Sequence, residues 1–444
     1  MSEVGEVAAN THLMIAQEDT HEVPDAGPDS PGPALFAEDQ GRLLHIHREN
    51  AFDDFARQPL LPNRLGRLGP GISWCDVDAD GDDDLLVGGA AGGAVSVLAN
   101  DGGRFRPAVH TSSAALGIAG DSTAVVTLPD SDGSLRAFLG VSSWEQEQGV
   151  PSMHLLRRTG DGGWQLQGNA VGEKVVTGPM ALGDVNGDGR PDVFVGGRMV
   201  RGRYPEAAGS NVLLNEAPGA KDPDPERWSG ALKGIGLVSG AVMADFDRDG
   251  DLDIALAREW DAPTLMLNNG KGFDDAGERL GLASHPGWWN GIAAGDFDGD
   301  GLLDLIVTNW GENSKYGRSP GPDKPLLVRY GDIDGNGSFD VIEAHKDKAS
   351  NKLVPERGLS CSSGAIPFIR QRTPTYRAFG ESDLWGIYGN ELGTLKTAGA
   401  SELRHGVFLN RGNRFEFVPR PREAQWAPAF GVSVADFDGD GRLD

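Results

Sequence analysis

A nine-residue acidic motif occurs six times in the sequence, and this repetition constrains the fold more than any other feature. All six copies fit the pattern D-x-[DN]-x-[DN]-G-x-x-D. They begin at residues 76, 184, 245, 296, 332 and 436. The glycine at position six permits a sharp turn, so the oxygens of positions one, three, five and nine and the carbonyl of position seven can meet. The motif therefore predicts six loops that bind Ca²⁺, which takes roughly 6–8 oxygen ligands.

The predicted calcium ligands are the residues at positions one, three, five, seven and nine of each copy. They are Asp76, Asp78, Asp80, Asp82, Asp84, Asp184, Asn186, Asp188, Arg190, Asp192, Asp245, Asp247, Asp249, Asp251, Asp253, Asp296, Asp298, Asp300, Leu302, Asp304, Asp332, Asp334, Asn336, Ser338, Asp340, Asp436, Asp438, Asp440, Arg442 and Asp444. Mg²⁺ fits such a loop less well, because it prefers a tighter octahedron that keeps several waters. A single copy could be only a solvated turn, but six copies in register favour binding sites.

Short apolar segments surround the loops and have the length of β-strands. GAVMADF and IALARE flank the loop at residue 245, a third segment often closes in Asn, as in TLMLNN, and a fourth begins at Phe, as in GKGF. Four short strands per repeat are typical of a β-propeller blade, with the acidic loop joining the first strand to the second. The sequence therefore predicts an all-β fold. We expect a β-propeller of about seven four-stranded blades over residues 34–444, with the last blade truncated and with a small helical insertion.

An EF-hand shares the first nine positions of the motif but needs a Glu at position twelve and flanking helices. Position twelve is apolar in the first four copies: Val87, Val195, Leu256 and Val307. Only Glu343, in the fifth copy, satisfies the EF-hand pattern, and strand-like segments surround it. The sequence therefore favours propeller loops over EF-hands.

Uneven spacing of the loops leaves the blade arrangement open. The long interval between the first two loops has room for two units, and STAVVTLPDSDGSLRAFLGVSSWE predicts a degenerate blade that binds no ion. The step to residue 332 is too short for a blade, so either that blade has lost its outer strands or the Asp332 loop joins different strands of a blade. Residues 346–403 lack the strand pattern and predict the helical insertion, with Pro between short helices. Six blades is the alternative count.

The loops and their flanks resemble those of the FG-GAP/VCBS repeat family, which includes the calcium-binding blades of integrin α-subunits. Residues 195–206 (VGGRMVRGRYPE) and 361–380 (CSSGAIPFIRQRTPTYRAFG) are similar to segments of bacterial proteins that carry an ASPIC/UnbV domain and are related to cartilage acidic protein. VAANTHLMIAQED near the N-terminus resembles the end of an ASPIC domain, and EVPDAGPDSPGPA has a linker composition. Residues 1–33 are thus interpreted as a linker and the tail of a preceding domain. The resemblance implies calcium-dependent structure and binding, usually outside the cell.

The net charge of −26 argues against nucleic acid or an anionic membrane surface as partner, because phosphate would be repelled. Apolar runs are short and interrupted, so no transmembrane segment is predicted. His45 and His47 have the spacing of a metal-binding strand, but no second ligand cluster accompanies them. The two cysteines, Cys75 and Cys361, lack metal-site spacing.

Aromatic and cationic residues recur just after the second strand of several predicted blades, on the face opposite the acidic loops. The predicted ligand-binding residues are Trp144, Arg198, Arg201, Arg203, Tyr204, Trp260, Trp288, Trp289 and Trp310. Trp and Arg near a propeller axis suit stacking on sugar rings or pairing with carboxylates. The alternative is that each Trp packs between neighbouring blades.

These features predict a calcium-binding β-propeller that serves as a binding or adhesion module for a glycan or protein ligand. We expect it to be extracellular, on the cell surface or periplasmic, with an export signal upstream of this chain. The alternative is a polysaccharide-acting enzyme, a lyase or hydrolase, built on a calcium-stabilised propeller. No nucleophile elbow or phosphate-binding loop is present, and no catalytic residue is predicted.

The sequence closes on GVSVADFDGDGRLD, which supplies one predicted inner strand and a complete set of loop side chains. A propeller sheet that stops there would leave backbone N–H and C=O groups unpaired. We therefore expect the chain to be part of a longer protein, the Asp436 loop to be the weakest calcium site, and the chain to associate through its open edge.

Overall fold

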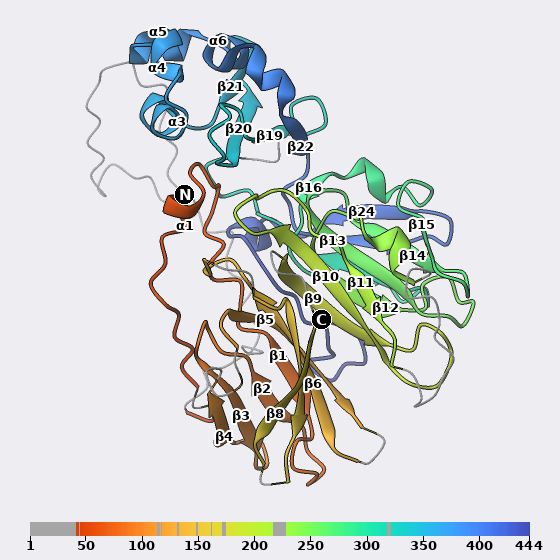
Figure 1. The fold of residues 1–444 in the computed structure, drawn as a ribbon. Helices are drawn as coiled ribbons and strands as arrows, with labels where there is room; N and C mark the ends of the chain where they lie inside the picture. The colour runs from red at the N-terminus through yellow and green to blue at the C-terminus, as the bar shows by residue number, and fades with distance from the viewer. Residues whose placement is uncertain are drawn as a thin grey trace, which may run out of the picture.

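The computed structural model describes residues 41–444 except residues 44, 113–115, 117, 131–132, 148–149, 161, 171–174, 216–227 and 318–320. Within this part of the chain, antiparallel sheets dominate and helices are short (Figure 1). The predicted all-β fold is confirmed. The predicted linker and domain tail at residues 1–33 lie outside the described residues.

The first three sheets are built from strands that follow one another along the chain. The first sheet contains β1 (Ile72–Cys75), β2 (Asp84–Val87), β3 (Ala94–Asn100) and β4 (Phe105–Ser112). The second contains β5 (Asp121–Pro129), β6 (Leu135–Ser142), β7 (Met153–Arg158) and β8 (Trp164–Ala170). The third contains β9 (Val175–Gly183), β10 (Asp192–Val200) and β11 (Asn211–Leu213). The single pair Ser142 and Val176 joins the second and third sheets into one seven-stranded sheet. The predicted degenerate unit thus forms β5 and β6.

The fourth and fifth sheets complete the series. The fourth contains β12 (Leu237–Ala244), β13 (Asp253–Asp261), β14 (Thr264–Asn268) and β15 (Phe273–Asp275), and the short β16 (Gly287–Trp288) pairs with β13. The fifth has the order β17 (Ile292–Gly295), β18 (Asp304–Val307), β23 (Gly406–Asn410) and β24 (Phe415–Pro419). Because β18 pairs directly with β23, residues 308–405 form an insertion within the fifth sheet. This insertion is longer than the predicted one at 346–403.

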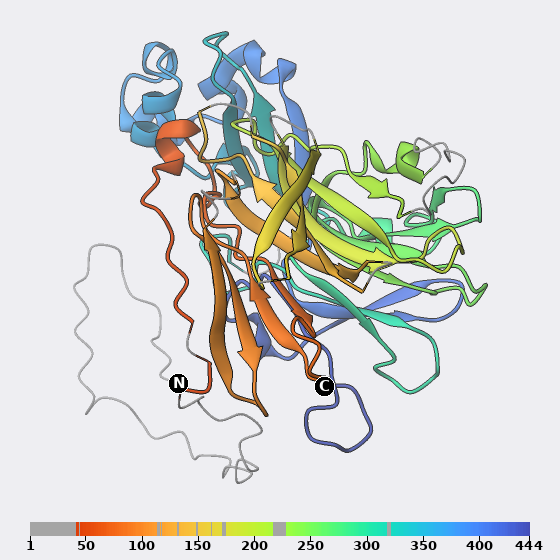
Figure 2. The ribbon, with the colours of Figure 1, turned by 60° about the horizontal axis from the view of Figure 1, so that its bottom comes forward.

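The first strand of each sheet packs against the first strand of the next. β1 contacts β5, β5 contacts β9, β9 contacts β12, and β12 contacts β17, so the sheets fan out from the middle of the molecule (Figure 2). Small residues permit this approach. At Gly240 of β12, an added Cβ would lie 2.9 Å from the Ile292 nitrogen, and at Gly291 it would lie 3.1 Å from the Gly431 Cα. The segment at Gly431 therefore follows the fifth sheet in the series. The predicted inner strand does not form there, since residues 431–444 have no paired neighbouring strand.

Gly240→Ala is expected to lower the free energy of unfolding by about 1–3 kcal/mol, because the new methyl group would force β12 and the start of β17 apart. Gly234→Ala is the matched control, since an added Cβ there meets nothing within 4 Å. Urea unfolding of both variants measures the difference. Equal stability of the two would contradict close packing of first strands at Gly240.

The insertion folds as a separate sheet with short helices beside it. The sheet has the order β21 (Leu353–Pro355), β20 (Asp340–Lys346), β19 (Leu326–Gly331) and β22 (Lys396–Ala400). The helices are α3 (Leu359–Ala365), α4 (Ile369–Arg372), α5 (Tyr376–Glu381) and α6 (Leu384–Tyr388), seen together in Figure 1. The Asp332 loop joins β19 to β20. It therefore connects the two middle strands of this sheet, as in the predicted alternative in which the loop joins different strands of a blade. The count of seven blades stays a prediction.

The insertion and a segment near the N-terminus together cover one face of the sheets. We call residues 52–68, which include the short helix α1 (Asp54–Arg57), the N-terminal strap. Asp54 Oδ1 of the strap accepts hydrogen bonds from the Leu65 and Gly66 nitrogens and from Trp144 Nε1 of the second sheet. Leu326 and Ala400 of the insertion share a hydrophobic cluster with residues of the third and fourth sheets. This face is therefore buried beneath two added segments.

Several large apolar side chains remain exposed near the two ends of the series of sheets. Ile72 and Trp74 of β1 are 57% and 54% exposed, and Phe430, Phe437 and Leu443 are also exposed. These residues suit the predicted association through an open edge, which stays a prediction. Among the described residues, no helix has the length and apolar composition needed to cross a membrane.

Candidate metal sites

Each acidic loop is held by the same backbone hydrogen bonds. In the first copy, the Asp76 carboxylate accepts from the Asp80 and Gly81 nitrogens at 3.2 and 3.1 Å. Gly81 has a φ of 100°, the left-handed geometry that its position in the motif predicts. The position-one carboxylates Asp184, Asp245, Asp296, Asp332 and Asp436 accept from positions five and six of their loops in the same way.

The Asp at position nine ties the loop to two strands. Asp84 Oδ2 accepts from the Val77 nitrogen at 2.9 Å, and Asp84 Oδ1 accepts from the Asn100 nitrogen at 2.7 Å, where the third strand ends. The Asn100 side chain also donates to the Asp83 carbonyl at 3.0 Å. Three other copies repeat the contact between position nine and an Asn, in the pairs Asp192 with Asn215, Asp253 with Asn268 and Asp304 with Asn410. The recurring Asn is visible in the sequence, but its structural role was not recognised there.

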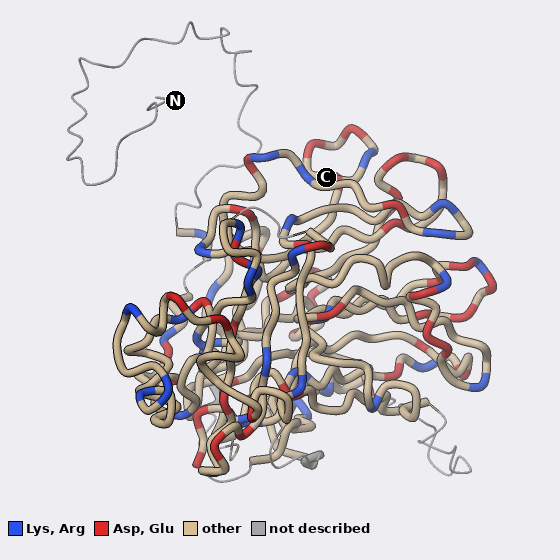
Figure 3. The backbone as a smooth tube through the Cα atoms, turned by 90° about the horizontal axis from the view of Figure 1, so that it is seen from above, with Lys and Arg blue, Asp and Glu red and all other residues tan. Residues whose placement is uncertain are grey.

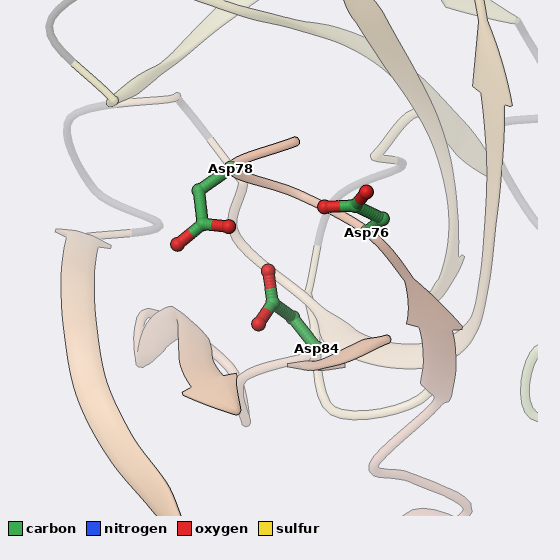
Figure 4. Close-up of side chains that lie close together, drawn as sticks. All are labelled: Asp76, Asp78 and Asp84. Carbon is green, nitrogen blue, oxygen red and sulfur yellow. The ribbon is translucent and has the colours of Figure 1, made fainter. Parts of the chain in front are cut away.

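Carboxylates converge in five of the six loops. Figure 4 shows Asp76, Asp78 and Asp84 directing their oxygens toward a common space. In each of the five groups, one potential ligand atom per residue lies within 4.8 Å of the others. Besides the group in Figure 4, they are Asp245, Asp247 and Asp249; Asp296, Asp298 and Asp300; Asp332, Asp334 and Asp340; and Asp436, Asp438 and Asp444. Such a set of hard oxygen donors fits a divalent cation.

The remaining loop has Asn186 at position three, and its residues form no such carboxylate group in the described part of the chain. No position-seven residue occurs in the five groups either. The predicted ligand at position seven is the backbone carbonyl, and that prediction remains untested. Acidic residues recur at loop tips along the border of the molecule (Figure 3).

Burial makes the inner carboxylates of the loops hard to ionise without a cation. Desolvation raises the pKa of Asp192, Asp253 and Asp340 to about 6, and their backbone hydrogen bonds only partly oppose this rise. The pKa of Asp247 is also raised, first by desolvation and then by the neighbouring Asp249. A bound cation would favour the ionised form of these carboxylates and so oppose the rise of their pKa values.

Arginine side chains occupy two of the loops. Arg190 Nη2 lies 2.7 Å from Asp188 Oδ2 in the second copy. Arg411, which follows β23, places Nη1 2.5 Å from Asp298 Oδ2 and 3.3 Å from Asp300 Oδ2. A guanidinium at these carboxylates competes with a metal ion for the same oxygens.

Arg411→Ala is expected to tighten calcium binding at the Asp296 loop, by about three- to tenfold, because two ligand carboxylates lose a competing cation. Arg414→Ala, on the same exposed turn, is the control. Calcium titration of the two variants by calorimetry measures the change. Weaker binding in Arg411→Ala would mean that the arginine orients the carboxylates for the metal.

The Asp436 loop differs from the others in its exposure. Asp436, Asp438 and Asp444 are all exposed, whereas Asp84, Asp192, Asp253 and Asp304 at position nine have no exposed surface. In the described residues, no third-strand Asn donates to Asp444. That the Asp436 loop is the weakest calcium site stays a prediction.

The EF-hand alternative fails at Glu343. This side chain is fully buried, and its Oε2 pairs with Lys315 at 3.0 Å and Arg357 at 3.5 Å. The Tyr316 hydroxyl donates to its other oxygen. Strands β19 and β20 flank the loop, so Glu343 stabilises the insertion instead of binding an ion in the Asp332 loop.

The predicted ligand-binding aromatics lie inside the protein, and all but Trp289 belong to one hydrophobic cluster. Trp144, Tyr204 and Trp289 have no exposed surface, and Trp260 and Trp288 are 3% and 1% exposed. The insertion and the N-terminal strap cover Trp144, Tyr204, Trp260 and Trp288. Trp289 instead packs between the fourth and fifth sheets, as in the alternative that each Trp packs between neighbouring blades. Stacking of these rings on a ligand stays a prediction, which their burial disfavours. Partly buried Trp310 stacks on Trp288 with ring centres 4.1 Å apart. The sequence pattern alone could not show that two added segments cover this face.

The predicted arginines have separate partners. Arg198 pairs with Glu259, which is 3% exposed and also accepts from the Tyr204 hydroxyl at 2.9 Å. Arg201 donates to the Gln146 carbonyl at 3.1 Å, and exposed Arg203 pairs with Glu206. Of the two candidate metal-binding histidines, His47 pairs with Glu49 at 2.6 Å. Neither histidine belongs to a metal-ligand group in the described residues.

Comparison with known proteins identifies the repeat. Residues 211–307 match the family model described as an FG-GAP-like repeat. This part of the chain is an FG-GAP-like repeat. The match covers β11 to β18 and contains the Asp245 and Asp296 loops. The finer resemblance to ASPIC/UnbV-containing proteins stays a prediction.

Two curated relatives are integrins. Human integrin alpha-7 is 31% identical over 173 residues, which cover 35% of this chain and 14% of the human protein. Integrin alpha-7 of Rattus norvegicus is 28% identical over the same length. The chain thus spans only a small part of these relatives.

Among solved structures, the V. cholerae biofilm matrix protein Bap1 has a TM-score of 0.33 and 13% identity, covering 65% of this chain and 56% of that one. An Agrocybe aegerita lectin that recognises non-reducing terminal N-acetylglucosamine has a TM-score of 0.32 and 22% identity, covering 62% and 66%. At these TM-scores, the likenesses support no functional inference.

Proposed function

We propose that the chain is a calcium-stabilised binding or adhesion module for a glycan or protein ligand. One observation supports calcium binding: carboxylates converge in five loops, and these loops share the same pattern of backbone hydrogen bonds. Oxygen-only sites of this kind suit Ca²⁺, and extracellular modules bind it with Kd values of roughly 10⁻⁴–10⁻³ M. We therefore place the module outside the cytoplasm: extracellular, on the cell surface or periplasmic.

A cleft beside the insertion supports a binding role. A cleft of about 750 Å³ lies between the insertion and the third and fourth sheets, lined by residues that include Pro205, Asp261, Leu327, Tyr330 and Thr397. Clefts of this size hold small ligands and the ends of larger ones. The partial similarity to integrins is compatible with a protein ligand. The cleft is equally compatible with a glycan.

A glycan and protein array probed with the calcium-loaded chain tests the proposal. Retention of a ligand without its chemical change is the expected result. Formation of new reducing ends or unsaturated products from a retained polysaccharide would instead establish the lyase or hydrolase alternative. Tyr204 cannot serve as a contact residue in either case, because its side chain is fully buried.

A further inference from the structure

A second hollow lies where the first strands meet, and we call it the central chamber. It has a volume of about 420 Å³ and is more enclosed than the cleft beside the insertion. Its wall is made by the N-terminal strap and by successive sheets, which contribute Thr123 from β5, Thr177 from β9 and Ser239 from β12. A hollow lined by several sheets at once gives convergent polar groups, which is typical of a ligand site.

Positive charge is concentrated at this chamber in a protein whose net charge is −26. Arg64 and Arg67 of the strap line it, and Arg198 of β10 lines it from the sheet side. Arg198 is neutralised by Glu259, and Glu145 lies near enough to Arg67 to interact with it. The Arg64 side chain has no ion pair or hydrogen bond with any described residue. The chamber therefore retains an excess of positive charge.

Uncharged polar groups complement the arginines. Asn290, only 2% exposed, lines the chamber; its Nδ2 donates to two carbonyls, whereas its Oδ1 has no partner among the described residues. The Thr123 hydroxyl likewise has no partner among them. Unpaired buried groups of this kind are costly, so a ligand that supplies hydroxyl groups would satisfy them.

We infer that the central chamber binds a small hydroxylated carboxylate of the size of a hexuronic acid. A guanidinium pair at the strap recognises the carboxylate through charge-assisted hydrogen bonds, while Asn290 and Thr123 select for hydroxyl groups. Charge alone would admit any anion, and hydroxyl recognition alone would admit neutral sugars. The inference deepens the proposed binding function by naming a ligand class, and it is independent of the calcium loops.

Calorimetric titration of the calcium-loaded chain with glucuronate, galacturonate, glucose and sulfate tests this inference. Binding of a uronate, with glucose at least tenfold weaker, is the expected result. Arg64→Ala and Arg67→Ala should each weaken uronate binding about tenfold, because each removes a charged hydrogen bond. Arg104→Ala, an exposed arginine between β3 and β4, is the control and should bind as the parent does. Arg64 and Arg67 are exposed, so their loss should leave the fold intact.

Three results would overturn the inference: no uronate binding, equal binding of uronate and glucose, or unchanged uronate binding in the Arg64→Ala/Arg67→Ala double variant. Sulfate bound as tightly as uronate would show a general anion site and contradict the role given to Asn290 and Thr123. If uronate fails to bind while the array retains another ligand, the proposed binding function stands. Only the assignment of a uronate to the central chamber is then wrong.

Discussion

Removal of calcium with EGTA is expected to lower the melting temperature by more than about 10 °C. A cation that binds only the folded state stabilises it by about 2.7 kcal/mol per site when its concentration is a hundred times Kd. Over the five carboxylate groups, this sums to about 13 kcal/mol, which is comparable to the whole stability of a typical domain, about 5–15 kcal/mol. Calorimetry or circular dichroism with calcium, with EGTA and with calcium restored measures the effect.

The variant Asp247→Asn tests the contribution of a single loop to the calcium-dependent stability. It removes one ligand from a loop whose other carboxylates, Asp245 and Asp249, remain. Its melting temperature in calcium should fall, whereas in EGTA it should be unchanged or rise, because the repulsion that raises the pKa of Asp247 is relieved. A melting temperature that does not respond to EGTA would show that the loops are not structural cation sites.

Acid should partly replace calcium in the chelated protein. Burial raises the pKa of Asp192, Asp253 and Asp340 to about 6, above the unfolded value of about 3.9. Protonation of these groups therefore stabilises the metal-free fold at low pH, and this contribution is lost as pH rises through 6. The difference in melting temperature between calcium and EGTA should accordingly widen from pH 5 to pH 7.

The sequence predicts the loops well because their chemistry is local. Nine consecutive residues contain every side chain that converges around Asp76, so the spacing of oxygens and glycine is sufficient. The strands on either side also follow from their apolar pattern. Asn100 was missed because it comes from the third strand, and only the folded sheet brings its nitrogen to Asp84.

Burial that results from contacts between distant parts of the chain could not be predicted from the sequence. The Asp332 loop has the same motif as the others, yet β19 and β20 belong to the insertion, which a count of repeats cannot reveal. Trp260 and Trp288 likewise follow the pattern of exposed connections. They are buried because residues 308–405 fold back over them, and no local signal marks that contact.

Glu259→Gln is expected to destabilise the protein by about 3–5 kcal/mol, because it removes the charge that pairs with Arg198 in a nearly closed interior. Glu259 is 3% exposed, and the side chain of Arg198 is 12% exposed. The Tyr204 hydroxyl donates to Glu259 and accepts from Trp260 Nε1 at 2.6 Å, so the network joins the third sheet to the fourth. Urea unfolding in the presence of calcium measures the loss.

Glu147→Gln provides the matched control. Glu147 also pairs with an arginine, Arg57 at 2.9 Å, but its side chain is 92% exposed, so its loss should cost about 0–1 kcal/mol. The double variant Arg198→Gln/Glu259→Gln should be more stable than the sum of its single changes predicts, because no buried charge is left unpaired. Equal effects of Glu259→Gln and Glu147→Gln would show that water reaches the interface between the third and fourth sheets. The insertion would then cover that face only loosely, and the buried tryptophans would again be available to a ligand.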